Sequence, residues 1–130
     1  MPPTMPQTMK RALPLTLILA LSSAVAFAAP TAPPTQADKL SKAATMAAEA
    51  QDLAKRKACL NCHGIDRKVI GPALRDVAKR YRGKKDAERM LTAKVLNGGQ
   101  GAWGPVAMPA NRQVDEAQAR QLVRWVLTLK

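Results

Sequence analysis

The sequence predicts an all-α protein with one small domain. Three observations support this prediction: long segments are rich in helix-forming residues, apolar residues recur three and four positions apart, and none of the 130 residues lies in an alternating strand pattern. About 100 residues remain after the N-terminal segment described next, which is enough for one modest core and too few for two.

The N-terminal residues have the three-part pattern of a secretory signal. Lys10 and Arg11 precede an apolar run over residues 12–21, and small residues ending at Ala28 fit the cleavage pattern that follows such a run. The run is too short for a membrane span, which needs about 20 apolar residues in a helix. We therefore expect residues 1–28 to be a signal peptide that directs the chain to the periplasm and is cleaved near its last residue.

The segment after the signal contains three prolines among alanines and threonines. This composition predicts an extended tether over residues 29–36, followed by the folded domain over residues 37–130. The first part of that domain, residues 37–60, is rich in Ala, Lys, Leu, Glu and Gln and has no Gly or Pro. It predicts a helix that runs into the first cysteine.

Three more helices are expected further along the chain. Residues 73–81 and 87–95 each carry apolar side chains at helical spacing, and both segments are followed by glycine. Residues 97–111 are dense in Gly and Pro, so they predict an irregular loop that presents particular side chains. The last helix begins at Asp115, which forms a capping-box pattern with Gln118, and runs to the C-terminus.

Cys59 and Cys62 are followed directly by the one histidine of the chain, His63. Together they form the C-x-x-C-H pattern of covalent haem attachment. Positions three and four residues apart share a helix face, so the three side chains can converge on one flat ligand. The thiols would form thioethers with the haem vinyl groups, and His63 would bind the iron. A zinc site would lack an evident fourth ligand, and the helical pattern does not suit a thioredoxin-like fold.

The opposite axial position needs a second ligand, for which the chain after the signal offers three methionines and no further histidine. Met90 has helical spacing with apolar neighbours and is better explained as core. Met46 precedes the haem motif on a helix that is too close to fold over the ring. Met108 lies between two prolines in the irregular loop, and it is the preferred ligand. A His/Met pair fills both axial sites, which suits electron transfer and excludes substrate.

With this motif and this methionine, the chain resembles the small class I c-type cytochromes of bacteria, of the cytochrome c-551/c-552 type. The resemblance covers residues 53–127 and implies one covalent haem c per chain, enclosed by packed N- and C-terminal helices with short helices and loops between them. Beyond the haem motif it depends on matches at Gly71-Pro72, Asn97-Gly98, Gln100-Gly101, Trp103-Gly104-Pro105, Met108-Pro109 and Trp125-Val126.

The resemblance also implies roles for residues around the haem. The carbonyl of Pro72 would accept a hydrogen bond from Nδ1 of His63, which fixes the imidazole and raises its basicity. Trp103 would donate its indole N–H to a haem propionate, although plain packing would also explain an aromatic residue there. Asn111 would correspond to an asparagine near the methionine sulfur, but the loop before Asp115 is one residue longer than in the family.

Two positions depart from the family pattern. Lys94 stands where many members have an arginine near the propionates, and Ala54 stands where many have an aromatic residue on the first helix. Trp125 is interpreted as core on the last helix, packed against the first helix. The redox potential and the packing of the first helix are therefore expected to differ from those of typical members.

The chain is strongly basic, with 21 Lys and Arg, nine Asp and Glu, and a net charge of +12. Loss of Lys10 and Arg11 with the signal leaves +10, which the two haem propionates lower further. Such a charge speeds the encounter with acidic partners by about tenfold or more at low salt. We expect a monomer whose partners are acidic redox proteins or membrane respiratory complexes. No nucleic-acid partner is expected, because four aromatic residues offer no stacking platform.

The motif and the resemblance together predict a function. The chain is expected to carry single electrons between respiratory-chain donors and terminal reductases or oxidases, and not to be an enzyme. The alternative is a haem c subunit of a larger oxidoreductase, or a peroxidase-like haem enzyme. A catalyst needs an open iron site, which Met108 would block.

Overall fold

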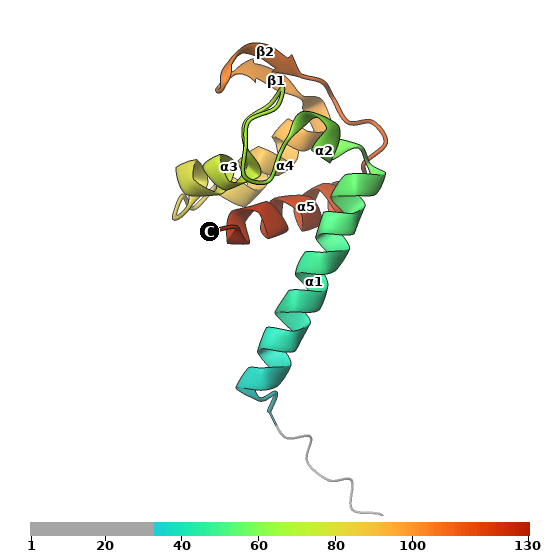
Figure 1. Ribbon diagram of the computed structural model, residues 1–130, viewed down its shortest axis with the longest axis vertical. Coiled ribbons are helices and arrows are strands. Elements are labelled where there is room, and N and C mark those ends of the chain that lie inside the picture. Colours follow the sequence, from blue (N-terminus) through green and yellow to red (C-terminus); the bar gives the residue numbers. More distant parts are fainter. Residues whose placement is uncertain (1–32) are drawn as a thin grey trace, which may run out of the picture. The chain divides into compact units, whose positions relative to one another are not determined.

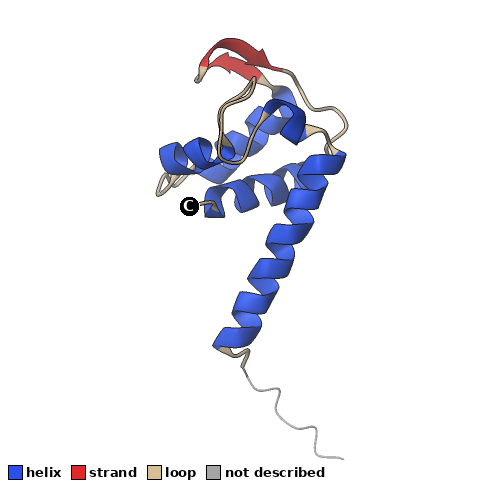
Figure 2. Cartoon of the chain, viewed as in Figure 1, coloured by secondary structure: helices blue, strands red, loops and turns tan. Residues whose placement is uncertain are grey.

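The computed structural model describes residues 33–130, so the predicted signal peptide and half of the predicted tether lie outside the described residues. The described part forms five α-helices and one antiparallel hairpin (Figure 1, Figure 2). In chain order the elements are α1 (Gln36–Arg56), α2 (Cys59–Cys62), α3 (Leu74–Tyr81), α4 (Ala87–Asn97), β1 (Gly99–Gly101), β2 (Gly104–Met108) and α5 (Glu116–Thr128).

Helix α1 consists of an exposed N-terminal part and a buried C-terminal part. It begins with a capping box, in which the Thr35 side chain accepts from the backbone N–H of Asp38 and the Asp38 carboxylate accepts from that of Thr35. Residues 36–46 are exposed, whereas Ala50 and Leu53 are buried in the core. The first turns of α1 accordingly extend away from the other helices in Figure 1.

The expected continuous helix over residues 37–60 is interrupted before the first cysteine. Helix α1 ends at Arg56, and Ala58 has a left-handed backbone with φ 59°. The chain then forms the separate single turn α2. Alanine is a strong helix former, so the composition of this segment gave no indication of the interruption.

The core lies where α1, α3 and α4 pack against α5. Leu53 of α1 belongs to the same buried cluster as Leu122 and Trp125 of α5, and Val77 and Tyr81 of α3 complete this side of the cluster. The predicted packing of the N-terminal helix against the C-terminal helix is confirmed. Burying a large apolar side chain of this kind contributes about 1.5–3 kcal/mol to the free energy of unfolding.

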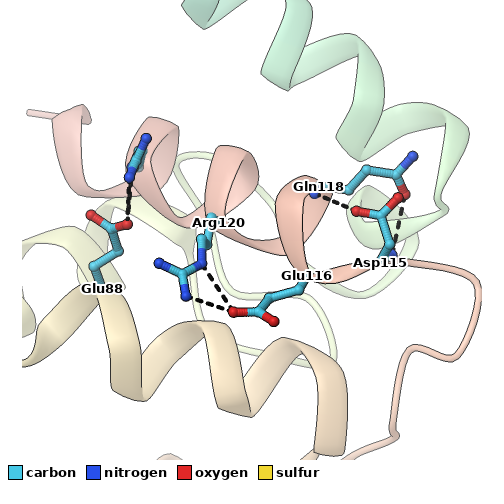
Figure 3. Close-up of polar contacts among 6 residues, drawn as sticks. Glu88, Asp115, Glu116, Gln118 and Arg120 are labelled. Atoms are coloured by element: carbon cyan, nitrogen blue, oxygen red, sulfur yellow. Dashed lines mark hydrogen bonds and ion pairs between the residues drawn. The ribbon is translucent and has the colours of Figure 1, made fainter.

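Helix α5 begins as the sequence predicted. The Asp115 carboxylate accepts from the backbone N–H of Gln118 at 2.8 Å, and the Gln118 side chain accepts from the backbone N–H of Asp115 at 3.4 Å (Figure 3). On the exposed face of the helix, Glu116 pairs with Arg120. These contacts fix the point at which the chain enters the core after the long loop.

The prediction that the domain contains no strand is wrong for residues 97–111. Here β1 and β2 pair antiparallel, with Gly99 opposite Met108 and Gly101 opposite Gly104, and an irregularity interrupts the register. The strands are three and five residues long and almost entirely exposed. Such short exposed strands have no buried face, so they leave no alternating pattern in the sequence.

Candidate cofactor-binding cleft

One cavity of about 260 Å³ brings together every residue that the sequence analysis singled out as a cofactor-binding or metal-binding residue. We call the segment over residues 59–75 the proximal wall and the segment over residues 98–114 the distal wall. Most of the remaining lining side chains are apolar and come from α3, α4 and α5. The predicted residues that line the cavity are Cys59, Cys62, His63, Pro72, Trp103, Met108 and Asn111.

The motif residues reach the cavity in a different way from that expected. Cys59 and Cys62 are the two ends of α2, and both are free and partly buried. His63 has already left the helix, with an extended backbone at φ −118° and ψ 115°. The three side chains therefore do not share one helix face, but the sharp turn out of α2 brings them to the same cavity.

The proximal wall is held together by backbone hydrogen bonds. The carbonyl of Cys62 accepts from the N–H groups of Ile70 at 3.1 Å and Gly71 at 2.8 Å. The carbonyl of Gly64 accepts from the N–H of Leu74 at 2.9 Å, which ties the turn after His63 to the start of α3. These bonds close a compact loop around the imidazole.

The His63 ring is fixed on two sides. Its Nδ1 lies 2.9 Å from the carbonyl oxygen of Pro72, the contact that the resemblance implies. A carbonyl can only accept, so Nδ1 carries the proton and Nε2 is the nitrogen available to a metal. Gly71 packs against the same ring so closely that a Cβ there would overlap its Cε1, Nδ1 and Nε2 atoms. The sequence analysis noted Gly71 only as part of a motif and missed this contact.

The Cys59 thiol lies in a partly buried setting that suits an uncharged product. Burial raises the pKa of the Cys59 thiol above its usual value, and the nearby Cys62 adds to the rise. Cys59 is therefore a neutral thiol at pH 7. A thioether at this position would carry no charge, so its formation would leave no buried charge in the cleft.

Met108 lies at the end of β2 and faces the cavity from the distal wall. Gly98 packs against the backbone of this segment. Its φ is +71°, and a Cβ there would overlap the Met108 carbonyl oxygen and the backbone of Pro109 and Ala110. Glycine is thus required both by the backbone conformation and by the close approach of the two segments.

The structure gives Asn111 a backbone-binding role. Its side-chain amide donates to the carbonyl of Val95 at 2.9 Å and to that of Pro109 at 3.2 Å. Its own N–H also donates to Val95 at 3.2 Å. Asn111 therefore joins α4 to Pro109, the residue that follows Met108. The resemblance implied that the Asn111 amide lies near the methionine sulfur, but in this structure the amide donates to backbone carbonyls.

Trp103 lies at the turn of the hairpin and is 37% exposed. The Arg80 guanidinium of α3 stacks over its ring, with Cζ 4.6 Å from the centroid, and donates to the carbonyl of Ala102 at 2.6 Å. Arg80 thus anchors the hairpin to α3. The sequence analysis missed it, because an exposed arginine in a basic chain is not distinguished by its position.

The cavity fits a covalently attached haem. It offers two thiols for thioethers, an imidazole with Nε2 available, a thioether sulfur on the facing wall and an apolar interior. Lys94 also lines the cavity and is the one lysine of α4, so it can supply a positive charge to a propionate. This set of side chains could therefore attach a haem c through two thioethers and offer its iron one imidazole and one thioether ligand.

The chain matches the cytochrome c family over residues 47–130. Cytochrome c-552 of Nitrosomonas europaea is 45% identical over 94 residues, which cover 72% of this chain and 90% of that protein. Cytochrome c-551 of Pseudomonas aeruginosa is 44% identical over 84 residues, or 65% of this chain and 80% of that protein. The crystal structure of wild-type Nitrosomonas europaea cytochrome c552 has a TM-score of 0.60 at 46% identity and covers 62% of this chain and 99% of that chain. The expected fold is therefore confirmed.

Proposed function

The chain belongs to the cytochrome c family, and we propose that it is a periplasmic one-electron carrier whose haem iron is bound by His63 and Met108. It is a small monohaem cytochrome with haem c attached at Cys59 and Cys62, an electron carrier and not an enzyme. The observation that carries the proposal is that both cysteines, His63 and Met108 line the same cavity.

The proximal wall supplies a strong ligand in a fixed orientation. When bound, haem c supplies an iron that changes between the ferrous and ferric states. The hydrogen bond from Nδ1 of His63 to Pro72 keeps the proton away from Nε2 and makes that nitrogen more electron-rich. Gly71 behind the ring prevents it from tilting away. The two contacts therefore hold the imidazole in one orientation for binding iron.

The distal wall supplies a weak ligand, and apolar side chains of α3 and α4 exclude water from the cavity. The Met108 thioether is neutral and raises the reduction potential relative to more strongly donating ligands. Leu74, Val77, Leu91 and Val95 line the cavity and keep its interior apolar, which favours the iron state of lower charge. If His63 and Met108 both bind the iron, no position would remain open to substrate, and the site would suit electron carriage better than the peroxidase-like alternative.

The basic charge supports acidic partners. The domain from residue 29 onward carries +10, and the many lysines and arginines of α3 and the following turn are exposed. Such a field attracts an acidic redox protein or the acidic docking face of a membrane respiratory complex and raises the rate of encounter. We propose such proteins as the electron donor and acceptor, with the carrier acting as a monomer between them.

The proposed location is the periplasm. Residues 1–28 have the pattern of a signal peptide cleaved near Ala28, which would direct the chain out of the cytoplasm. Within residues 33–130, the structure has no helix that is both long and apolar enough to cross a membrane. Amino-terminal sequencing of the purified protein locates the cleavage site directly.

Visible spectra of the holoprotein test the distal ligand. We expect the wild type to show a low-spin haem c spectrum that does not change with cyanide in the ferric state or carbon monoxide in the ferrous state. Met108→Ala opens the iron, so this variant binds both ligands. Met90→Ala is the matched control, because Met90 lies outside the cavity lining and is 38% exposed, so its interpretation as a core residue is wrong. A wild type that binds both ligands readily would overturn the proposal and favour a catalytic role.

A further inference from the structure

We propose that Lys57 and Gln113 form a clasp that positions Met108 over the haem, so that Gln113 is a positioning residue for the distal ligand. The inference rests on the proposed function, in which Met108 binds the iron. It starts from two residues that lie 56 positions apart and join the two walls of the cleft.

The clasp consists of two reciprocal hydrogen bonds. Nζ of Lys57 donates to the backbone carbonyl of Gln113 at 2.6 Å, and Nε2 of Gln113 donates to the backbone carbonyl of Lys57 at 3.3 Å. Each side chain therefore binds the main chain of the other residue. The two bonds close a ring, so either one restrains the geometry of the other.

The proximal end of the clasp is rigid and adjoins the haem attachment site. Lys57 is the C-cap residue of α1, and its N–H donates to the carbonyl of Leu53 at 2.9 Å. The Lys57 carbonyl that Gln113 binds also lies 3.9 Å from Sγ of Cys59. Gln113 is thus tied to the backbone beside the first haem-bearing sulfur.

The distal end of the clasp leads to the methionine. Nε2 of Gln113 also donates to Oδ1 of Asn111 at 3.2 Å. The Asn111 amide in turn donates to the carbonyl of Pro109, which directly follows Met108. A continuous chain of polar contacts therefore connects Lys57 with the residue next to the distal ligand.

The clasp adds to two other restraints on the chain between Met108 and α5, which are the Asn111 bonds to Val95 and the buried Val114 side chain. Pro109, Ala110, Arg112 and Gln113 are all exposed, and α5 does not begin until Glu116. A thioether is a weak, neutral ligand, so the position of its backbone decides how often the sulfur leaves the iron. Loosening the clasp is therefore expected to make Met108 easier to displace.

The test uses the ferric holoprotein and imidazole as a competing ligand. Gln113→Leu removes the bonds to Lys57 and Asn111 with little change of volume, and Lys57→Met removes the bond to the Gln113 carbonyl. We expect each variant to exchange Met108 for imidazole about fivefold faster than the wild type, the factor that corresponds to one lost hydrogen bond. The double variant should fall short of the product of the single effects, because both changes open the same ring.

Matched controls separate positioning from general destabilisation. Gln121→Leu makes the same side-chain change on α5. Lys55→Met removes the same charge from α1, where Lys55 forms an exposed ion pair with Asp52. Both control variants should exchange Met108 for imidazole at the wild-type rate. The clasp is overturned if Gln113→Leu and Lys57→Met exchange within about twofold of wild type, or no faster than the two controls.

Visible spectra of the ferric holoprotein distinguish a failure of the clasp from a failure of the proposed Met108 ligation. A ferric wild type with the long-wavelength sulfur-to-iron absorption band, absent from Met108→Ala, supports Met108 as the ligand. Unchanged exchange in the clasp variants then refutes the clasp alone. If the wild type lacks the band, the proposed ligation fails and the clasp fails with it.

Discussion

The proximal wall of the cleft is held by backbone hydrogen bonds within a short stretch of chain, whereas the distal wall combines the pairing of its hairpin with hydrogen bonds from side chains of other elements. Around His63, carbonyls at Cys62 and Gly64 bind amides from residues up to Leu74. Met108 is paired with Gly99 in the hairpin, and Arg80 on α3 and Lys57 at the end of α1 bind the distal wall from outside it. His63, the proposed strong ligand, is therefore supported by nearby residues of the chain. Met108, the proposed weak ligand, is supported in part by residues far away in the sequence.

This difference indicates how each wall responds to substitution. Backbone bonds do not depend on side-chain identity, so the proximal wall should tolerate most changes except those that fill the space beside His63. The distal wall depends on individual side chains, so single substitutions should loosen it in small steps. The ease with which the sulfur leaves the iron can then vary while the haem attachment site stays unchanged.

The largest effect is expected for Gly71→Ala. A Cβ at this position would overlap the His63 ring, so either the imidazole or the loop must shift. We expect a loss of about 1–3 kcal/mol in the free energy of unfolding, typical of overpacking, together with a changed reduction potential. Chemical denaturation and a potentiometric titration of the holoprotein measure the two quantities.

Gly83→Ala is the control for that experiment. Gly83 has φ +77° and no atom near its Cβ position, so alanine there costs about 1 kcal/mol through its backbone alone. The reduction potential should stay at the wild-type value. An unchanged potential in Gly71→Ala as well would show that the proximal wall absorbs the extra carbon and would contradict the rigid support described above.

The next effect concerns the end of the distal wall. Asp115→Ala removes the capping box where the chain enters α5 and should cost about 1 kcal/mol of stability. Thr35→Ala removes the equivalent cap of α1, but residues 36–46 are exposed and make little contribution to the core. Its global free energy of unfolding should therefore change much less. Equal losses in the two variants would mean that the start of α1 is more firmly packed than its exposure indicates.

The smallest effect on global stability is expected for Arg80→Leu. This variant loses the hydrogen bond to Ala102 and the stacking on Trp103, but both lie on an exposed hairpin. The free energy of unfolding should fall by less than about 1 kcal/mol, while amide hydrogen exchange in residues 99–108 becomes about fivefold faster. Arg89→Leu, which breaks an exposed pair with Asp86, should leave that exchange as in the wild type.

The helices and the haem motif could be predicted because their signals are local. Asp115 and Gln118 are three residues apart, and the spacing of Leu74, Val77 and Tyr81 repeats that of a helix. The cysteines and His63 are nearly adjacent, so their common role is visible without a structure. The resemblance added Pro72, and the structure places its carbonyl beside Nδ1 of His63.

The missed features depend on contacts between distant or unremarkable residues. Arg80 and Ala102 are 22 positions apart, and Lys57 and Gln113 are 56 apart, so no periodicity connects them. The hairpin was missed because its strands are short, exposed and rich in glycine. Side-chain support of the distal wall is therefore the part of the site that needed three-dimensional coordinates.

Ala58 has a consequence for how this chain can change during evolution. Its left-handed backbone costs an alanine about 1–2 kcal/mol in the folded protein, and glycine would remove that cost. Glycine would also give the unfolded chain more freedom, which offsets about 0.4–1 kcal/mol of the gain. Ala58→Gly therefore changes the free energy of unfolding by less than the cost of the left-handed backbone alone. What selection has to preserve beside Cys59 is the direction of the turn, because that direction carries the chain from α1 into the haem-binding residues.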